Sequence, residues 1–82
     1  MPVTQDTLQQ IRKIDEQIIA LLSQRVIACR KVLEEDEEGL GPEELADTVT
    51  HWVEEADERG LNMSVMNQMA KLTVKLCRAT EE

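Results

Sequence analysis

Apolar residues recur at alternating intervals of three and four between residues 11 and 32 of the chain. Side chains at this spacing lie on one face of a helix. No Gly or Pro occurs from Thr4 to Glu38, so we predict one long amphipathic helix over that range. About 30 residues make a rod of roughly 45 Å, which a second copy of the chain would cover. The stripe consists of Ile11, Ile14, Ile18, Leu21, Arg25, Ala28 and Val32.

A second helix is predicted after the break at Glu38–Pro42. Pro42 suits its first turn, and Gly60 suits the left-handed position that ends it after Arg59. Its apolar stripe consists of Leu45, Val49, Trp52, Val53 and Ala56.

A third helix is predicted from there to the C-terminus, with Asn62 or Ser64 as its N-cap. No window alternates between apolar and polar residues as a strand would. We therefore predict an all-α fold of three helices in a single domain, residues 1–82. The stripe of the third helix consists of Val65, Met69, Leu72 and Leu76.

The composition favours self-association. The chain has 82 residues with one Trp, no Phe and no Tyr. A domain this small buries only about 60% of its unfolded surface, and aromatic side chains usually supply the largest burial energies. We therefore expect a homodimer.

The net charge of −8 argues against binding to nucleic acids or anionic membranes. No apolar run is long enough to span a membrane, and the N-terminus has no features of a signal peptide. We therefore predict a cytoplasmic protein.

Cys29, Cys77 and His51 lack metal-ligand spacing, so we expect no metal and no cofactor. The simplest interpretation of the two cysteines is reduced thiols in helix packing.

Arg25 occupies a position in the first stripe where an apolar side chain is expected. A buried guanidinium needs a partner, and Arg binds carboxylates in a bidentate manner, so Arg25 could form an anion site. Alternatively, it pairs with an acid of a neighbouring helix or extends out to solvent.

Acids dominate the middle of the chain. Residues 33–58 hold 12 acids and no Lys or Arg, whereas the remaining sequence has 9 bases and 5 acids. The acidic surface formed by residues 33–58 could dock a basic partner, or it could simply be solvated.

Met63, Met66 and Met69 are interpreted as core filling, with an adaptable groove as the alternative. Trp52 is interpreted as a core anchor.

The motif I-D-x-x-I-x-x-L-L-x-x-R runs from Ile14 to Arg25. With it, the chain resembles the all-helical (type II) chorismate mutases, and the order of helices and the Gly60–Leu61 connection also fit that family. The resemblance implies an intertwined homodimer that rearranges chorismate, a dianion, to prephenate without a cofactor. Such catalysis is largely electrostatic stabilisation by fixed cations.

The resemblance also implies a set of site residues. Arg25 matches a catalytic, substrate-binding arginine, and Val32 an apolar wall residue. Glu81 falls where the family has a Gln or Glu that hydrogen-bonds the ether oxygen. Cys77 falls where a serine or similar residue contacts a substrate carboxylate.

Three expected cations are absent. Leu8 and Asp36 stand where the family carries an arginine and a lysine, and the arginine of the family's middle helix falls near Glu44. Arg12, one turn after Leu8 on the same face, could replace the first, and Arg78 or Lys71 could enter the site from the third helix.

These features favour a chorismate-mutase-like homodimer with a degenerate site. It would act as a binding or regulatory subunit of a larger, basic-surfaced enzyme of aromatic or secondary metabolism. The alternatives are an active enzyme on chorismate or isochorismate with a rearranged cation set, and a plain helical dimerisation module.

Overall fold

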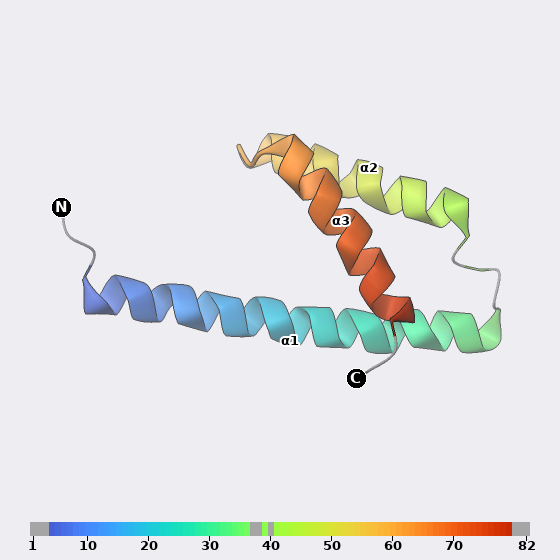
Figure 1. Ribbon diagram of the computed structural model, residues 1–82, viewed down its shortest axis with the longest axis horizontal. Coiled ribbons are helices and arrows are strands. Elements are labelled where there is room, and N and C mark those ends of the chain that lie inside the picture. The colour runs from blue at the N-terminus through green and yellow to red at the C-terminus, as the bar shows by residue number, and fades with distance from the viewer. Residues whose placement is uncertain (1–3, 37–38, 40, 80–82) are drawn as a thin grey trace.

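The computed structural model describes residues 4–36, 39 and 41–79. It contains three helices: α1 (Gln5–Glu35), α2 (Pro42–Glu58) and α3 (Met63–Arg78). No strand occurs in these described ranges, which confirms the all-α prediction. In Figure 1, α1 forms a long rod, α2 and α3 form a hairpin beside it, and the C-terminal end of α3 lies against α1.

Local sequence signals explain where the helices begin. The Thr4 hydroxyl accepts a hydrogen bond from the Thr7 N–H at 3.1 Å, and the Asn62 side chain accepts one from the Val65 N–H at 2.9 Å. Each satisfies one of the N–H groups that a helix start leaves without a partner. Of the two caps predicted for α3, Asn62 is therefore confirmed, and Pro42 lies in the first turn of α2 as predicted.

The turn between α2 and α3 is a Schellman motif. Gly60 has a φ of +71°, the left-handed region that favours glycine, and the Leu61 N–H donates to the Ala56 carbonyl at 2.8 Å. The predicted end of α2 at Arg59–Gly60 is confirmed. This tight turn folds α3 back onto α2.

Two predicted helix ends are wrong. The first helix ends at Glu35 rather than Glu38, with Asp36 extended at a φ of −157°. Its last turn holds acids and no base, which opposes the negative end of the helix dipole. The third helix ends at Arg78 and not at the C-terminus, with Ala79 extended as its C-cap. Residues 37, 38 and 80–82 lie outside the described part.

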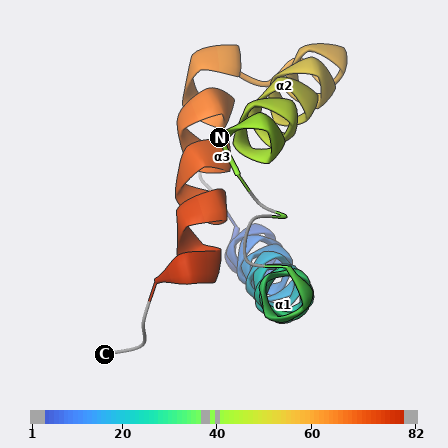
Figure 2. The same ribbon diagram turned by 90° about the vertical axis from the view of Figure 1, so that its right-hand side faces the viewer.

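The core of a single chain is small. Among the described residues, the buried apolar side chains are Ala56, Ala70 and Cys77, all on α2 and α3. No described residue of α1 is buried, and every residue from Thr4 to Leu21 is exposed. Figure 1 shows the N-terminal half of α1 extending away from α3, and Figure 2, which views α1 nearly end-on, shows it apart from α2.

The whole chain is extended for its size. Its radius of gyration is 15.5 Å, whereas a compact domain of this length has about 12 Å. Its principal extents are 51, 29 and 19 Å. The long α1 accounts for this shape, because it reaches beyond the hairpin that it contacts (Figure 1).

Candidate functional site

Residues of all three helices line a small cavity around Arg25. Its volume is about 30 Å³. Residues from α1, α2 and α3 contribute to it, so that segments far apart in the sequence share one site. The lining residues are Arg25, Cys29, Glu44, Leu45, Thr48, Val74 and Arg78.

The cavity carries charges of both signs. Arg25 is half-buried, while Glu44 and Arg78 are exposed at its rim. Two guanidinium groups can bind carboxylates in a bidentate manner, but the Glu44 carboxylate opposes any anion that enters. Glu44 is the acid near the position where the resemblance expects an arginine. The site therefore joins two of the predicted cations, Arg25 and Arg78, with an acid.

Cys29 and Cys77 form a disulfide between α1 and α3, with their Cα atoms 6.1 Å apart. The prediction of two reduced thiols is wrong. The helix crossing brings together two residues that lie 48 positions apart in the sequence, and spacing alone could not show this. Cys77 is only 2% exposed and its sulfur is bonded, so its side chain is not available as the predicted carboxylate contact.

Arg30 supports the same junction from α1. Its Nε donates to the Cys77 carbonyl at 3.3 Å, and its Nη2 donates to the Ala79 carbonyl, also at 3.3 Å. The last carbonyls of a helix have no partner within the helix, and cations near that end are favoured. The sequence analysis did not predict a role for Arg30. The only sequence feature that pointed to it is its position directly after Cys29.

The other predicted site residues that the structure describes do not line this cavity. Arg12 is exposed on the N-terminal half of α1, and Val32 is 40% exposed near the end of that helix. Lys71 is exposed on α3. Glu81 lies outside the described residues. Of the predicted set, only Arg25 and Arg78 are brought together as cavity-lining side chains.

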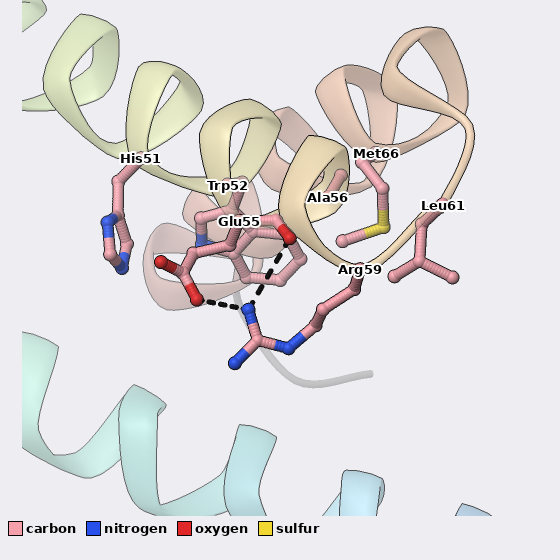
Figure 3. A pocket seen from close by; sticks show the side chains of 7 residues that line it. All are labelled: His51, Trp52, Glu55, Ala56, Arg59, Leu61 and Met66. Atoms are coloured by element: carbon pink, nitrogen blue, oxygen red, sulfur yellow. Dashed lines mark hydrogen bonds and ion pairs between the residues drawn. The ribbon is translucent and has the colours of Figure 1, made fainter.

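A larger pocket of about 290 Å³ lies at the turn between α2 and α3. Figure 3 shows its lining side chains, with the Arg59 guanidinium extended toward the Glu55 carboxylate. The Arg59 Nη1 donates to that carboxylate and also to the Glu55 carbonyl, the latter at 3.4 Å. The sequence did not predict this pocket. It is lined by His51, Trp52, Glu55, Ala56, Arg59, Leu61 and Met66.

The hydrogen bond from Arg59, together with its positive charge, lowers the pKa of Glu55 below its ordinary value. The small contribution that this pair makes to stability is present above the ordinary pKa of a glutamate, and it is lost as the pH falls through the lowered value.

The predicted core roles of Trp52 and the methionines hold only in part. Trp52 is half-buried and lines the pocket in Figure 3, so it is not a fully buried anchor. Met66 is also half-buried, but Met63 and Met69 are 48% and 46% exposed, which contradicts their prediction as core filling within one chain. The packing of three helices leaves too little interior for these side chains.

In the part of the chain that the structure describes, no group of three or more His, Cys, Asp or Glu could hold a metal ion. Within the same part, no helix is long and apolar enough to cross a membrane. Comparison of the chain with protein-family models, curated proteins and solved structures found no match.

Proposed function

We propose that this chain forms a chorismate-mutase-like helical homodimer with a degenerate catalytic site, and that it acts as a binding or regulatory subunit of a partner enzyme. The observation that carries this proposal is the size of the Arg25 cavity, about 30 Å³. Pockets for small molecules measure about 300 to 1,000 Å³, and a cavity of about 10 to 15 Å³ already holds one water molecule. In the single chain, a cavity of this size has no room for a molecule as large as chorismate.

The charges of the site also favour a degenerate enzyme. A dianionic substrate needs several fixed cations, yet Glu44 places a carboxylate in the cavity beside Arg25 and Arg78. Loss of one such electrostatic contact costs about 2.7 to 4 kcal/mol of transition-state stabilisation. An acid in place of a cation adds repulsion to that loss.

The proposed homodimer is supported by the surface of the single chain. It exposes 7016 Å², whereas a compact monomer of 9.3 kDa exposes about 5,000 Å². The excess of about 2,000 Å² per chain is within the range that permanent dimers bury. Much of the exposed apolar area lies on α1, where six Ile and Leu side chains between residues 8 and 21 are uncovered, namely Leu8, Ile11, Ile14, Ile18, Ile19 and Leu21.

A chorismate assay tests the loss of catalysis. We expect the purified homodimer to consume chorismate at less than a tenth of the typical enzyme turnover of about 10 s⁻¹. The physical reason is the small, mixed-charge cavity at Arg25. The measurement is the loss of chorismate absorbance over time. Turnover within about tenfold of that typical value, together with its loss in Arg25→Ala, would establish the active-enzyme alternative instead.

The proposed contact with a partner rests on the acidic surface. Residues 33–58 carry twelve acids and no Lys or Arg. Glu34 and Glu35 at the end of α1 are exposed, and so are Glu43, Asp47 and Glu54 on α2. A negatively charged surface attracts a positively charged partner and accelerates its association. The partner proposed here is therefore a protein with a basic surface, and the proposed location is the cytoplasm.

Charge reversal tests this contact. A carbodiimide cross-linker, which joins carboxylates directly to lysines, should couple acids within residues 33–58 to lysines of one protein in cells that express the chain. We expect Glu34→Lys with Glu35→Lys to abolish the cross-links, because the reversed charges repel a basic surface. The cross-linked peptides are identified by mass spectrometry.

A matched control uses two acids on α1 away from this surface, Asp6→Lys with Glu16→Lys. Both positions are exposed, and the change in net charge is the same. This control should keep the cross-links. Cross-links that persist after the reversal at Glu34 and Glu35, or that map outside residues 33–58, would refute the acidic contact surface.

A further inference from the structure

The disulfide lines the same cavity as the charged residues. Cys29 lies one helical turn after Arg25 on α1, and both residues face this cavity. On α3, Arg78 follows Cys77 directly and also lines the cavity. The bond between the two sulfur atoms therefore joins α1 and α3 beside the two guanidinium groups.

In the described part of the chain, the disulfide and two side-chain hydrogen bonds join α1 to α3. No described residue of α1 is buried. The two hydrogen bonds from Arg30 to the Cys77 and Ala79 carbonyls contribute about 1 kcal/mol each. The disulfide is the covalent link in this junction, so its presence or absence changes how closely the two helices approach at the cavity.

We infer that the Cys29–Cys77 disulfide is a redox gate on the Arg25 cavity: the oxidised chain holds the cavity narrow, and the reduced chain widens it enough to admit a carboxylate dianion. The identity of the ligand rests on the proposed function, whereas the gate rests on the positions of the disulfide and of Arg25. In a reducing compartment, disulfides are usually transient, catalytic or redox-sensing, which agrees with a gate.

The reductant is a dithiol. One of its thiolates attacks the Cys29 sulfur, which is half-buried, while Cys77 is buried. The Cys29–Cys77 bond breaks, a mixed disulfide forms on Cys29, and Cys77 leaves as a thiolate that takes up a proton. The second thiolate of the reductant then displaces Cys29, which also takes up a proton. Two electrons have passed to the protein, and the dithiol has become a disulfide.

Reduction opens the cavity because two thiols cannot approach as closely as two bonded sulfur atoms. α1 is a continuous helix, so a shift at Cys29 also moves Arg25, one turn away. The hydrogen bonds from Arg30 keep α1 and α3 adjacent. The two guanidinium groups can then move apart and admit an anion between them.

Labelling of arginine tests the gate without any ligand. The homodimer is reduced on an immobilised dithiol, separated from it, and treated with phenylglyoxal, which modifies accessible guanidinium groups. We expect Arg25 to react about tenfold faster in the reduced chain, a coupling within the usual range for linked sites. Arg12, exposed on the same helix, is the internal control and should react at the same rate in both forms. Mass spectrometry measures both rates.

Each outcome decides the inference. Faster labelling of Arg25 with Arg12 unchanged supports the gate. No change at Arg25 overturns it, and so does an equal increase at both residues, because that shows general unfolding. The variant with Cys29→Ser and Cys77→Ser should label Arg25 at the fast rate with or without the dithiol, and far-UV circular dichroism should show that its helices remain.

A second measurement separates the gate from the proposed ligand. In calorimetric titration, chorismate should bind the reduced homodimer about tenfold more tightly than the oxidised one. If Arg25 becomes accessible on reduction but chorismate does not bind, the gate stands and the chorismate-like ligand is wrong. If labelling does not change, the gate is wrong whatever chorismate does.

Discussion

Replacement of Ile14 and Ile18 by Glu is expected to abolish the homodimer and most of the helical fold. These side chains are 52% and 47% exposed on α1 in a single chain. A dimer contains four such side chains, two from each chain, and covers the exposed half of each. Complete burial of one is worth about 1.5 to 3 kcal/mol, so the four together stabilise the dimer by about 3 to 6 kcal/mol. The loss corresponds to at least about a hundredfold in the dimerisation constant.

The fold should be lost with the dimer because the single chain has so little core. Its buried apolar side chains, within the described residues, are Ala56, Ala70 and Cys77. Permanent homodimers often have no stable folded monomer, so their stability depends on protein concentration. Light scattering measures the mass, which should be twice 9.3 kDa for the native chain, and far-UV circular dichroism measures the helix content.

The matched control places two glutamates on the opposite face of α1, at Gln9 and Ala20. Both positions are exposed and lie nearly half a helical turn away from the apolar stripe. This variant should remain dimeric and helical. A native chain that is monomeric at micromolar concentration, or a dimer that survives both Ile14→Glu and Ile18→Glu, would contradict the proposed dimer surface.

Removal of the disulfide is the second large effect. The double variant Cys29→Ser, Cys77→Ser should lose about 4 kcal/mol of unfolding free energy, because the bond closes a long loop in the unfolded chain. The two cysteines are separated by 48 positions. A loss of this size lowers the Tm by about 15 to 30 °C in a domain of this length.

Thermal unfolding followed by circular dichroism measures this change, at one protein concentration for all samples because dimer stability depends on it. The native chain with a dithiol should match the double variant, which should itself be insensitive to the dithiol. A decrease in Tm of less than about 4 °C, equivalent to under 1 kcal/mol, would show that the disulfide contributes little to the fold.

The helices and their caps were predictable because each depends on residues close in the sequence. Asn62 caps α3 through the Val65 N–H three residues later, and Gly60 ends α2 because the turn requires a positive φ. The end of α1 was predicted less well. The spacing of apolar residues predicts where a helix can continue, but it takes no account of the repulsion between a run of acids and the negative end of the helix dipole.

Part of the candidate site was also predictable. Arg25 interrupts an apolar stripe, and the structure places it half-buried at the junction of three helices. Arg78 was a predicted substitute cation, and it lines the same cavity. Arg12 and Val32 could not be placed from periodicity, because a stripe shows which face of a helix a residue occupies and not what that face contacts.

The sequence by itself determined the three helices, their faces and the distribution of charge, because these depend on spacing along the chain. Only the tertiary structure decided that Cys29 bonds to Cys77, that Glu44 shares a cavity with Arg25, and that this cavity is about 30 Å³. The physical reason is that the crossing of α1 and α3 sets the distance between residues far apart in sequence. That crossing depends on packing between helices, which no local pattern specifies.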